Sequence, residues 1–295
     1  MKKVVFYVMT EKGFEVLRKA IEVNPSIIDF VVIGTDSNVK NDFSEAIIEL
    51  ARKSNVDFFI RGEEPVVDKD KYVIAISWRW MINHPISKLV VFHDSILPKY
   101  RGFAPLVNML INGERQIGVS AIFGATEYDK GDLIAQKISN IEYPITISEA
   151  IDLNNGNFIE LVEKIVHKIS NDEHLIGVPQ KEGDASYSIW RDDDDYEIDW
   201  SKSSVEIKRL IDAVGYPYLG ARTSTTKGEK IRVLKAEVVE DVQCELRHFG
   251  KVIFVNDGLP TVICGNGLLR ITEAYYFDDD GKSYLPMKSF RIKFV

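Results

Sequence analysis

The chain has 295 residues, of which 45% are hydrophobic and 28% charged, as in a globular enzyme with one large domain or a larger and a smaller one. The net charge of −8 argues against a broad nucleic-acid surface. Two cysteines, Cys244 and Cys264, cannot form a disulfide framework, no Cys/His cluster has zinc spacing, and no apolar run approaches the ~18 residues of a membrane span. We expect a cytoplasmic protein with no metal, membrane or nucleic-acid partner.

The first half of the chain alternates strand-like and helix-like segments. Strands are predicted over 3–9, 28–34, 57–60 and 71–77, and helices over 11–23 and 43–51, where apolar residues recur at helical spacing. This alternation predicts an α/β fold with a Rossmann-like, doubly wound, mostly parallel sheet. The turn at 9–13 lacks the glycine fingerprint of a dinucleotide site, and there is no Walker loop, so NAD is not expected.

An aromatic segment, Ser77–Ile82, follows the fourth strand. Trp78, Trp80 and Met81 could clamp a flat heterocycle at the carboxyl end of the sheet. The alternative, about as compatible with the pattern, is a helix start whose aromatic rings pack in the core.

A buried strand at 90–92 leads directly into His93, and the polar segment 94–102 then turns the chain. Ligands bind at the carboxyl ends of strands in open α/β sheets, and an imidazole there can shuttle a proton near neutral pH. An isolated histidine in this position is more often structural. His93 is therefore a candidate only in combination with a second group.

That second group is predicted to be Asp129, which stands at the entrance of a polar turn after the apolar run 118–123. A carboxylate beside an imidazole fixes its tautomer and stabilises its charged form, the arrangement of a general-base pair. Asp also forms turns for purely structural reasons.

The rest of the chain changes character near Gly183. A helix is expected over 145–170 and a surface connection over 171–181, followed by a short helix at 204–213 and strands at 230–239, 250–256, 259–264 and 268–276. These predict a small antiparallel, barrel-like β domain. We expect a catalytic domain over 1–183 and a β-rich domain over 184–295. The acidic run 192–195 beside Arg191 is usually a solvated face, although it could hold a positively charged amine.

The segments around His93 and Asp129 resemble the family of formyltransferases that use N10-formyltetrahydrofolate. The family pattern is Asn-x-His-x-Ser-Leu-Leu-Pro-x-Tyr-Arg-Gly followed by Asp-x-Gly-Asp-Ile. The matching residues are His93, Ser95, Leu97, Pro98, Tyr100, Arg101, Gly102, Asp129, Gly131 and Asp132. The segments 198–200 and 216–221 resemble its carboxyl-terminal part. Val91 replaces the family asparagine and cannot hydrogen-bond a developing oxyanion.

The resemblance implies a role for each matching side chain. His93 and Asp129 would be catalytic, His93 as the base and Asp129 as its orienting or proton-relaying partner. Asn83, a backbone N–H, a water or His93 itself could replace the missing oxyanion donor. The expected folate-binding residues are Trp80, Met81, Ile82, Ser95 and Asp132. The expected substrate-binding residues are Tyr100, Arg101, Trp190, Arg191, Trp200, Tyr216 and Tyr218.

Nucleotide-sugar N-formyltransferases fit best within this family. The chain shows no insertion like the basic loop of methionyl-tRNA formyltransferase, and it extends about a hundred residues beyond a glycinamide ribonucleotide formyltransferase. We expect N10-formyltetrahydrofolate as co-substrate, a UDP- or dTDP-linked amino sugar as acceptor, and no metal. The product would serve bacterial surface glycan synthesis. Three alternatives stay open: a methionyl-tRNA formyltransferase-like enzyme, a catalytically silent binding homologue, and a hydrolase. An apolar edge on the carboxyl-terminal strands could support a homodimer.

Overall fold

The computed structural model describes residues 3–35, 41–277, 281–287 and 289–295, which group into two compact units. The first unit contains the described residues up to 105 together with 116–140 and 152–188. The second contains 106–115, 141–151 and 189–295. Each unit is built around its own β-sheet.

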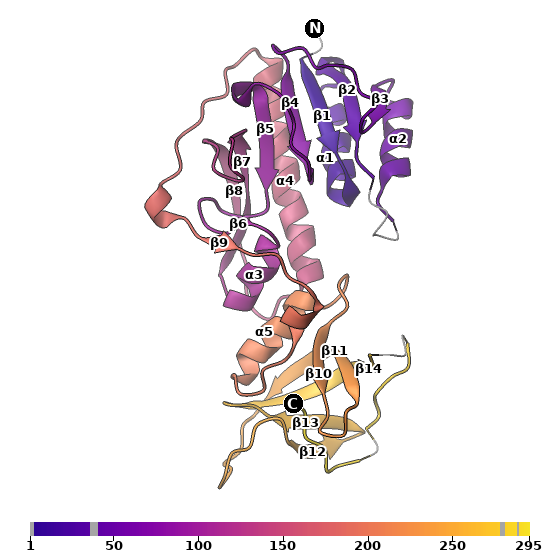
Figure 1. The fold of residues 1–295 in the computed structure, drawn as a ribbon, viewed down its shortest axis with the longest axis vertical. Helices are drawn as coiled ribbons and strands as arrows, with labels where there is room; N and C mark the ends of the chain where they lie inside the picture. Colours follow the sequence, from indigo (N-terminus) through magenta and orange to yellow (C-terminus); the bar gives the residue numbers. More distant parts are fainter. Residues whose placement is uncertain (1–2, 36–40, 278–280, 288) are drawn as a thin grey trace. The chain divides into compact units, whose positions relative to one another are not determined.

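The first unit is organised around a seven-stranded sheet in the order β3-β2-β1-β4-β5-β7-β8 (Figure 1). The first five strands in this order are parallel, and β7 and β8 add an antiparallel edge. The strands are β1 (Val4–Val8), β2 (Ile28–Ile33), β3 (Asp57–Ile60), β4 (Tyr72–Ile76), β5 (Leu89–His93), β7 (Gln116–Phe123) and β8 (Leu133–Asn140). A two-stranded ladder joins β6 (Arg101–Gly102) to β9 (Tyr187–Ser188).

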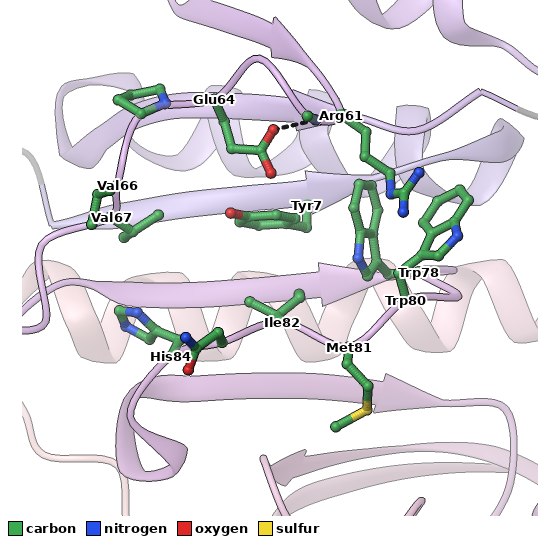
Figure 2. Close-up of a pocket in the computed structure, with 13 residues that line it drawn as sticks. Tyr7, Arg61, Glu64, Val66, Val67, Trp78, Trp80, Met81, Ile82 and His84 are labelled. Atoms are coloured by element: carbon green, nitrogen blue, oxygen red, sulfur yellow. Dashed lines mark hydrogen bonds between the residues drawn. The ribbon is translucent and has the colours of Figure 1, made fainter.

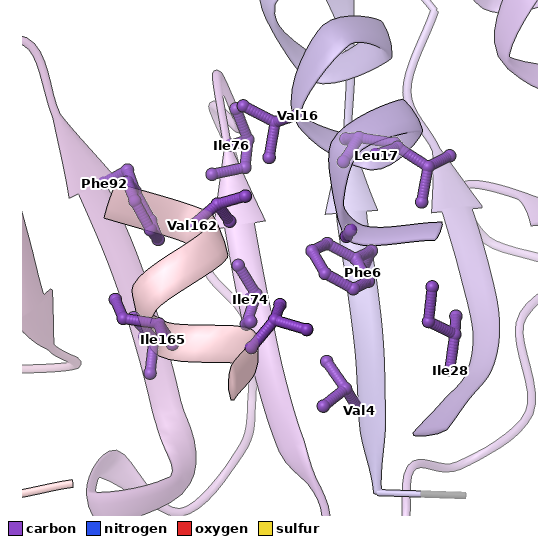
Figure 3. Close-up of a cluster of buried hydrophobic side chains, with 14 of the residues drawn as sticks. Val4, Phe6, Val16, Leu17, Ile28, Ile74, Ile76, Phe92, Val162 and Ile165 are labelled. Atoms are coloured by element: carbon purple, nitrogen blue, oxygen red, sulfur yellow. The ribbon is translucent and has the colours of Figure 1, made fainter. Parts of the chain in front are cut away.

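Three helices supply the apolar cover of one sheet face. They are α1 (Thr10–Val23), α2 (Ser44–Lys53) and α4 (Ile147–Ser170). Alternate residues of the central strands, including Phe6, Ile74 and Phe92, point to this face, where they pack with Leu17 of α1 and Val162 of α4 (Figure 3). This face holds the larger core of the unit.

The opposite sheet face has no α-helix among the described residues that cross it. The chain reverses direction along the sheet after β3, and right-handed crossovers then place the next two connections, 61–71 and 77–88, on this second face. Both connections are irregular apart from one short 3₁₀ turn, Ile86–Lys88. They cover a smaller apolar cluster that includes Tyr7 and Val91, and a hollow remains where a helix would otherwise pack.

The second unit contains an antiparallel five-stranded sheet in the order β10-β11-β14-β13-β12. The strands are β10 (Ala221–Ser224), β11 (Lys230–Val239), β12 (Val252–Asn256), β13 (Leu259–Ile263) and β14 (Leu268–Tyr276), and the helices are α3 (Pro105–Asn112) and α5 (Ser204–Val214). Residues 292–295 bond to both edges of the sheet, through Ser224 at the end of β10, Thr226 just after it, and Val252 of β12. These bonds give the sheet the barrel-like closure that the strand pattern predicts.

The predicted fold class, a mostly parallel Rossmann-like sheet followed by a smaller antiparallel β unit, is confirmed. The proposed boundary between residues 183 and 184 stays a prediction. Within the described ranges, no helix has both the length and the apolar character required to cross a lipid bilayer.

Candidate active site

His93 is the last residue of β5 and turns its imidazole toward the sheet face that lacks helices. Side chains alternate along a strand, so His93 shares the face of Val91, which packs in the smaller apolar cluster. The imidazole is largely buried, and its Nε2 lies 2.8 Å from the carbonyl oxygen of Tyr100. A carbonyl can only accept, so Nε2 carries the hydrogen. In the neutral ring, Nδ1 is therefore the atom that can take a proton.

Asp129 brings its carboxylate to that open nitrogen. The distance from His93 Nδ1 to Asp129 Oδ1 is 3.4 Å, and both side chains keep about a tenth of their surface exposed. The other carboxylate oxygen, Oδ2, accepts a 2.8 Å hydrogen bond from the backbone N–H of Gly102. A proton on Nδ1 would make the ring an imidazolium and turn the first contact into a charge-assisted hydrogen bond with the carboxylate. The two predicted catalytic side chains thus meet in a partly accessible place.

The loop after His93 is held by a buried polar network. Ser120 Oγ donates to the carbonyl of Ser95 at 2.6 Å and accepts from the N–H of Leu97 at 3.0 Å. Gln136 Nε2 donates to Ser120 Oγ and to the carbonyl of Leu97. The hydroxyl of Ser95, a predicted folate contact, is buried and donates to the carbonyl of Lys99. In this structure Ser95 therefore shapes the loop.

Three non-glycine residues near the pair adopt left-handed backbone conformations. They are Ser77 (φ 55°), Tyr100 (φ 58°) and Asp129 (φ 57°). Each such residue costs roughly 1–2 kcal/mol relative to a right-handed conformation, and such strain persists where the surroundings over-determine it, often at functional sites. Tyr100 holds Nε2 of His93, and Asp129 faces Nδ1.

The hollow on the same sheet face is a pocket of about 510 Å³, within the range of small-molecule sites. Figure 2 shows the loop at 61–67 on one side of Tyr7 and the segment 78–84 on the other. The predicted folate-binding residues Trp80, Met81 and Ile82 all line it, and so does Asn83. The other lining residues are Tyr7, Arg61, Gly62, Glu64, Pro65, Val66, Val67, Trp78 and His84.

Aromatic rings make one end of the pocket flat and rigid. Trp78 packs edge-on against Tyr7 and Trp80, with ring centroids 5.0 Å and 5.1 Å apart. The central carbon of the Arg61 guanidinium lies 4.0 Å from the centroid of the Trp80 ring. A Cβ atom at Gly34 would come within 3.0 Å of Trp78 and 3.1 Å of Trp80, so the glycine makes room for both indoles. Such surfaces suit a planar heterocycle.

Burial of Tyr7 raises the pKa of its phenol to about 12, and the nearby Glu64 carboxylate adds to this shift. The phenol is therefore neutral at physiological pH and offers the pocket an uncharged hydroxyl.

The pocket and the His93–Asp129 pair belong to the same end of the same sheet face. Tyr7 of β1 pairs with Ala75 of β4, which pairs with Val91 of β5. Two strand spacings, about 10 Å, therefore separate Tyr7 from Val91, and His93 lies two residues further toward the carboxyl end. A ligand that binds in the pocket and extends along this sheet face would reach the imidazole of His93.

Arg101, a predicted substrate contact, is almost fully buried in the first unit. Its guanidinium bonds to the carboxylate of Glu182 at 2.8–3.0 Å and to Oε1 of Gln180 at 2.9 and 3.2 Å. The Arg101 side chain is 1% exposed. Its contacts make Arg101 a structural anchor in this structure.

Two further predicted site residues belong to the same unit. The backbone N–H of Tyr100 bonds to Ser186 Oγ, and the side chain of Asp132 is exposed.

The other predicted substrate residues belong to the second unit. Trp190 and Tyr216 are largely exposed, and Tyr218 is 43% exposed. Arg191 donates to Asn108 Oδ1 at 2.8 Å. Trp200 is buried, with its Nε1–H bonded to Thr223 Oγ1 at 2.9 Å. Trp190, Tyr216 and Tyr218 therefore each keep aromatic surface open to solvent.

The acidic run is already paired within the second unit. Asp193 and Asp194 form ion pairs with Arg222, and Asp193 also pairs with Arg232 at 2.6 Å. Arg222 and Arg232 both lie over the ring of Phe277. These arginines pair with two of the four aspartates, and the carboxylates of Asp192 and Asp195 accept from backbone N–H groups within the run, so the segment is held by internal contacts.

Sequence reasoning missed Gln180, whose side-chain amide donates to the carbonyls of Asp129 and Gly131. It stands in the stretch that we expected to be a surface connection. In the described part of the chain, no three His, Cys, Asp or Glu side chains are grouped as a metal site.

Comparison with known proteins places these observations in a family. Residues 2–152 match the model of the formyl transferase family, and residues 191–290 match the formyl transferase C-terminal domain. The chain belongs to the formyl transferase family. The predicted resemblance is therefore confirmed, and the His93–Asp129 pair lies in the part matched by the first model.

Among curated relatives, a methionyl-tRNA formyltransferase of Alkaliphilus oremlandii is 30% identical over 200 residues, 68% of this chain and 62% of that protein. The chain thus spans less than two thirds of that relative. A second methionyl-tRNA formyltransferase, from Clostridium novyi, is 26% identical over 77% of each chain.

Among solved structures, an N-formyltransferase of Helicobacter canadensis in complex with folinic acid and dTDP-3-aminofucose superposes with a TM-score of 0.73 at 17% identity. The match covers 92% of this chain and 99% of that one. WlaRD, a sugar 3N-formyltransferase solved with dTDP and 5-N-formyl-THF, has a TM-score of 0.70 at 15% identity, covering 92% and 97%. At these identities the match shows a shared fold.

Proposed function

We propose that this chain transfers the formyl group of N10-formyltetrahydrofolate to the primary amine of a nucleotide-linked amino sugar. The observation that carries the proposal is the His93 Nδ1–Asp129 Oδ1 contact at 3.4 Å, on the sheet face that also holds an aromatic pocket. The pocket is the proposed site of the folate heterocycle, with Trp80, Met81 and Ile82 as its contacts. No metal is needed for this chemistry.

The reaction follows from the positions of the proton-accepting atoms. The neutral amine attacks the formyl carbon, a C–N bond forms, and the carbonyl oxygen becomes an oxyanion. The amine must lose a proton during this step. Because Nε2 of His93 already donates to Tyr100, the proton goes to the edge formed by Nδ1 and the Asp129 carboxylate. The C–N10 bond then breaks, and N10 takes a proton as tetrahydrofolate leaves.

The oxyanion needs a hydrogen-bond donor, and one such donor contributes roughly 3 kcal/mol. Val91 supplies none. Asn83 lines the pocket and carries an amide N–H₂ group, so we propose it as the donor that replaces the family asparagine.

Three observations support the choice of acceptor. The aromatic side chains of Trp190, Tyr216 and Tyr218 are exposed and could stack on a nucleobase. The net charge of −8 disfavours a large RNA surface. Two solved structures that share this fold are an N-formyltransferase in complex with dTDP-3-aminofucose and a sugar 3N-formyltransferase. We therefore propose a UDP- or dTDP-linked amino sugar destined for bacterial surface glycans.

A second candidate acceptor is methionyl-tRNA, because two of the sequence relatives are named as methionyl-tRNA formyltransferases. Tetrahydrofolate release with purified protein separates the candidates. We expect release with one or more dTDP- or UDP-amino sugars and none with methionyl-tRNA. Release without any amine would instead identify a hydrolase, and sugar-nucleotide binding without release would identify a silent homologue.

A further inference from the structure

We propose that Gln180 and Arg101 are positioning residues that fix the Asp129 carboxylate against His93. The inference rests on the proposed function in one respect, the catalytic role of Asp129. In this proposal neither Gln180 nor Arg101 touches the substrate, and both act through the position of Asp129.

Gln180 connects Arg101 to the turn that carries Asp129. Its Nε2 donates to the carbonyl of Asp129 at 2.7 Å and to the carbonyl of Gly131 at 2.8 Å, so both amide hydrogens hold the turn. Its Oε1 accepts from Arg101 Nε at 3.2 Å and from Nη2 at 2.9 Å. The side-chain amide is thereby fully used.

Arg101 is itself fixed from several sides. Its guanidinium bonds to both carboxylate oxygens of Glu182 and to Tyr187 Oη, and its strand β6 pairs with β9. The hydrogen bonds from Arg101 hold the pKa of Glu182 below its ordinary value, so this carboxylate stays charged at neutral pH. Arg101 is therefore a rigid support rather than a mobile cation.

Together these bonds form a closed ring through Asp129. The residue after Arg101, Gly102, donates its N–H to Asp129 Oδ2, while Gln180 holds the Asp129 carbonyl. The connected residues Arg101, Gly102 and Gln180 thus hold both the main chain and the side chain of Asp129. This fixes where the second oxygen, Oδ1, lies relative to His93.

Asp129 needs such support because its backbone is in the left-handed region, with φ 57°. The turn is also tight, since a Cβ at Gly131 would lie 1.7 Å from the carbonyl oxygen of Phe123. If the two bonds from Gln180 were lost, the turn could relax toward a commoner backbone conformation. The carboxylate would then move relative to Nδ1 of His93.

The test compares three single-substitution variants of the full chain. Gln180→Glu keeps the size of the side chain and its bonds from Arg101, but it removes both N–H donors to the turn. Gln180→Leu removes the bonds on both sides. Gln116→Leu is the control, because the Gln116 amide makes an exposed hydrogen bond to Asn140 at the start of β7, whereas Ser120, further along that strand, is the residue that pairs with His93.

The decisive readout is the ¹⁵N signal pair of the His93 ring. The chain has five histidines, and the ring signals that disappear in the spectrum of His93→Asn are those of His93. We expect both Gln180 variants to move these signals toward those of Asp129→Asn, while Gln116→Leu leaves them unchanged. Wild-type His93 signals in a folded Gln180→Glu protein would overturn the proposal, and this variant suffices if Gln180→Leu does not fold.

Kinetics give the second readout. A misplacement of about 1 Å can cost ~10²-fold in rate, so we expect Gln180→Glu to lower kcat by roughly 10- to 100-fold with an unchanged KM for the folate. A purely structural role would instead lower the melting temperature and leave kcat per folded molecule unchanged. If the wild-type protein transfers no formyl group, the proposed function fails, whereas the His93 signals still decide the role of Gln180.

Discussion

The Nδ1 atom of His93 and the Oδ1 atom of Asp129 lie 3.4 Å apart, although one residue ends β5 and the other lies in the turn between β7 and β8. The antiparallel pairing of β5 with β7 and of β7 with β8 brings the two segments together. Tyr100 and Gly102, from the loop between them, then hold the outer atoms of the pair. The remaining nitrogen and oxygen face each other, and they are the two candidate proton acceptors for an attacking amine.

Removing either acceptor should slow turnover without removing the fold. We expect His93→Asn and Asp129→Asn each to lower kcat by about 10²- to 10⁴-fold, the usual contribution of a general base. The measurement is tetrahydrofolate release at saturating substrate.

Folate binding and the far-ultraviolet circular dichroism of both variants serve as controls, and we expect both to match the wild type. Near-wild-type turnover in the two variants would remove His93 and Asp129 from the mechanism.

Trp80 should contribute to folate affinity rather than to the chemical step. Its indole contacts both Trp78 and the Arg61 guanidinium, and aromatic stacking contributes roughly 0.5–1.5 kcal/mol. We therefore expect Trp80→Ala to weaken folate binding by about tenfold, since 1.4 kcal/mol is a factor of ten, with kcat little changed. Quenching of tryptophan fluorescence by a folate analogue measures the affinity.

Trp190→Phe is the matched control for that titration, because Trp190 is exposed in the second unit and lies outside the pocket. An unchanged folate affinity in Trp80→Ala would place the heterocycle elsewhere.

Local patterns in the sequence predict most of the elements and the catalytic pair. The strands at 4–8, 28–33 and 72–76 are buried throughout or nearly so, and such apolar runs separated by amphipathic helices point to a parallel sheet. His93 and Asp129 follow from their places at strand ends together with the family motif.

Contacts between distant segments could not be predicted in this way. Gln180 is one polar residue in an apparent surface stretch, and its role depends on a turn about fifty residues earlier. The burial of Arg101 requires Glu182 as a partner, and two aspartates of the acidic run pair with Arg222 and Arg232, which come later in the chain. No periodicity or local spacing links these positions, because tertiary packing alone brings them together.

The effect of having valine at position 91, where the family has asparagine, can be tested by the substitution Val91→Asn. Val91 shares the sheet face of His93 and is half-buried in an apolar cluster. We expect Val91→Asn to raise kcat by up to ~10²-fold in the Asn83→Ala background, where the proposed donor is missing, because one oxyanion donor can contribute that much. Burial of an amide among apolar side chains should at the same time cost about 1–3 kcal/mol of stability. Turnover and thermal unfolding measure the two effects.

Asn83→Ala completes this experiment. If Asn83 already serves as the donor, its removal lowers kcat and Val91→Asn partly restores it in the double variant. Unchanged turnover in Asn83→Ala would exclude Asn83 as the donor.

The ion pair that supports Arg101 predicts how stability depends on pH. Hydrogen bonds from Arg101 lower the pKa of Glu182 from its ordinary value of 4.5. The folded state therefore holds the charged carboxylate, and the pair contributes stability above pH 4.5 that is lost as the pH falls through the lowered value. We expect Glu182→Gln to melt below the wild type at pH 7, because Arg101 stays buried without its partner. The difference should shrink on acidification below pH 4.5. Glu127→Gln, which removes the carboxylate of an exposed pair with Lys130, should melt like the wild type at each pH, and a pH-independent difference for Glu182→Gln would contradict the assigned pair.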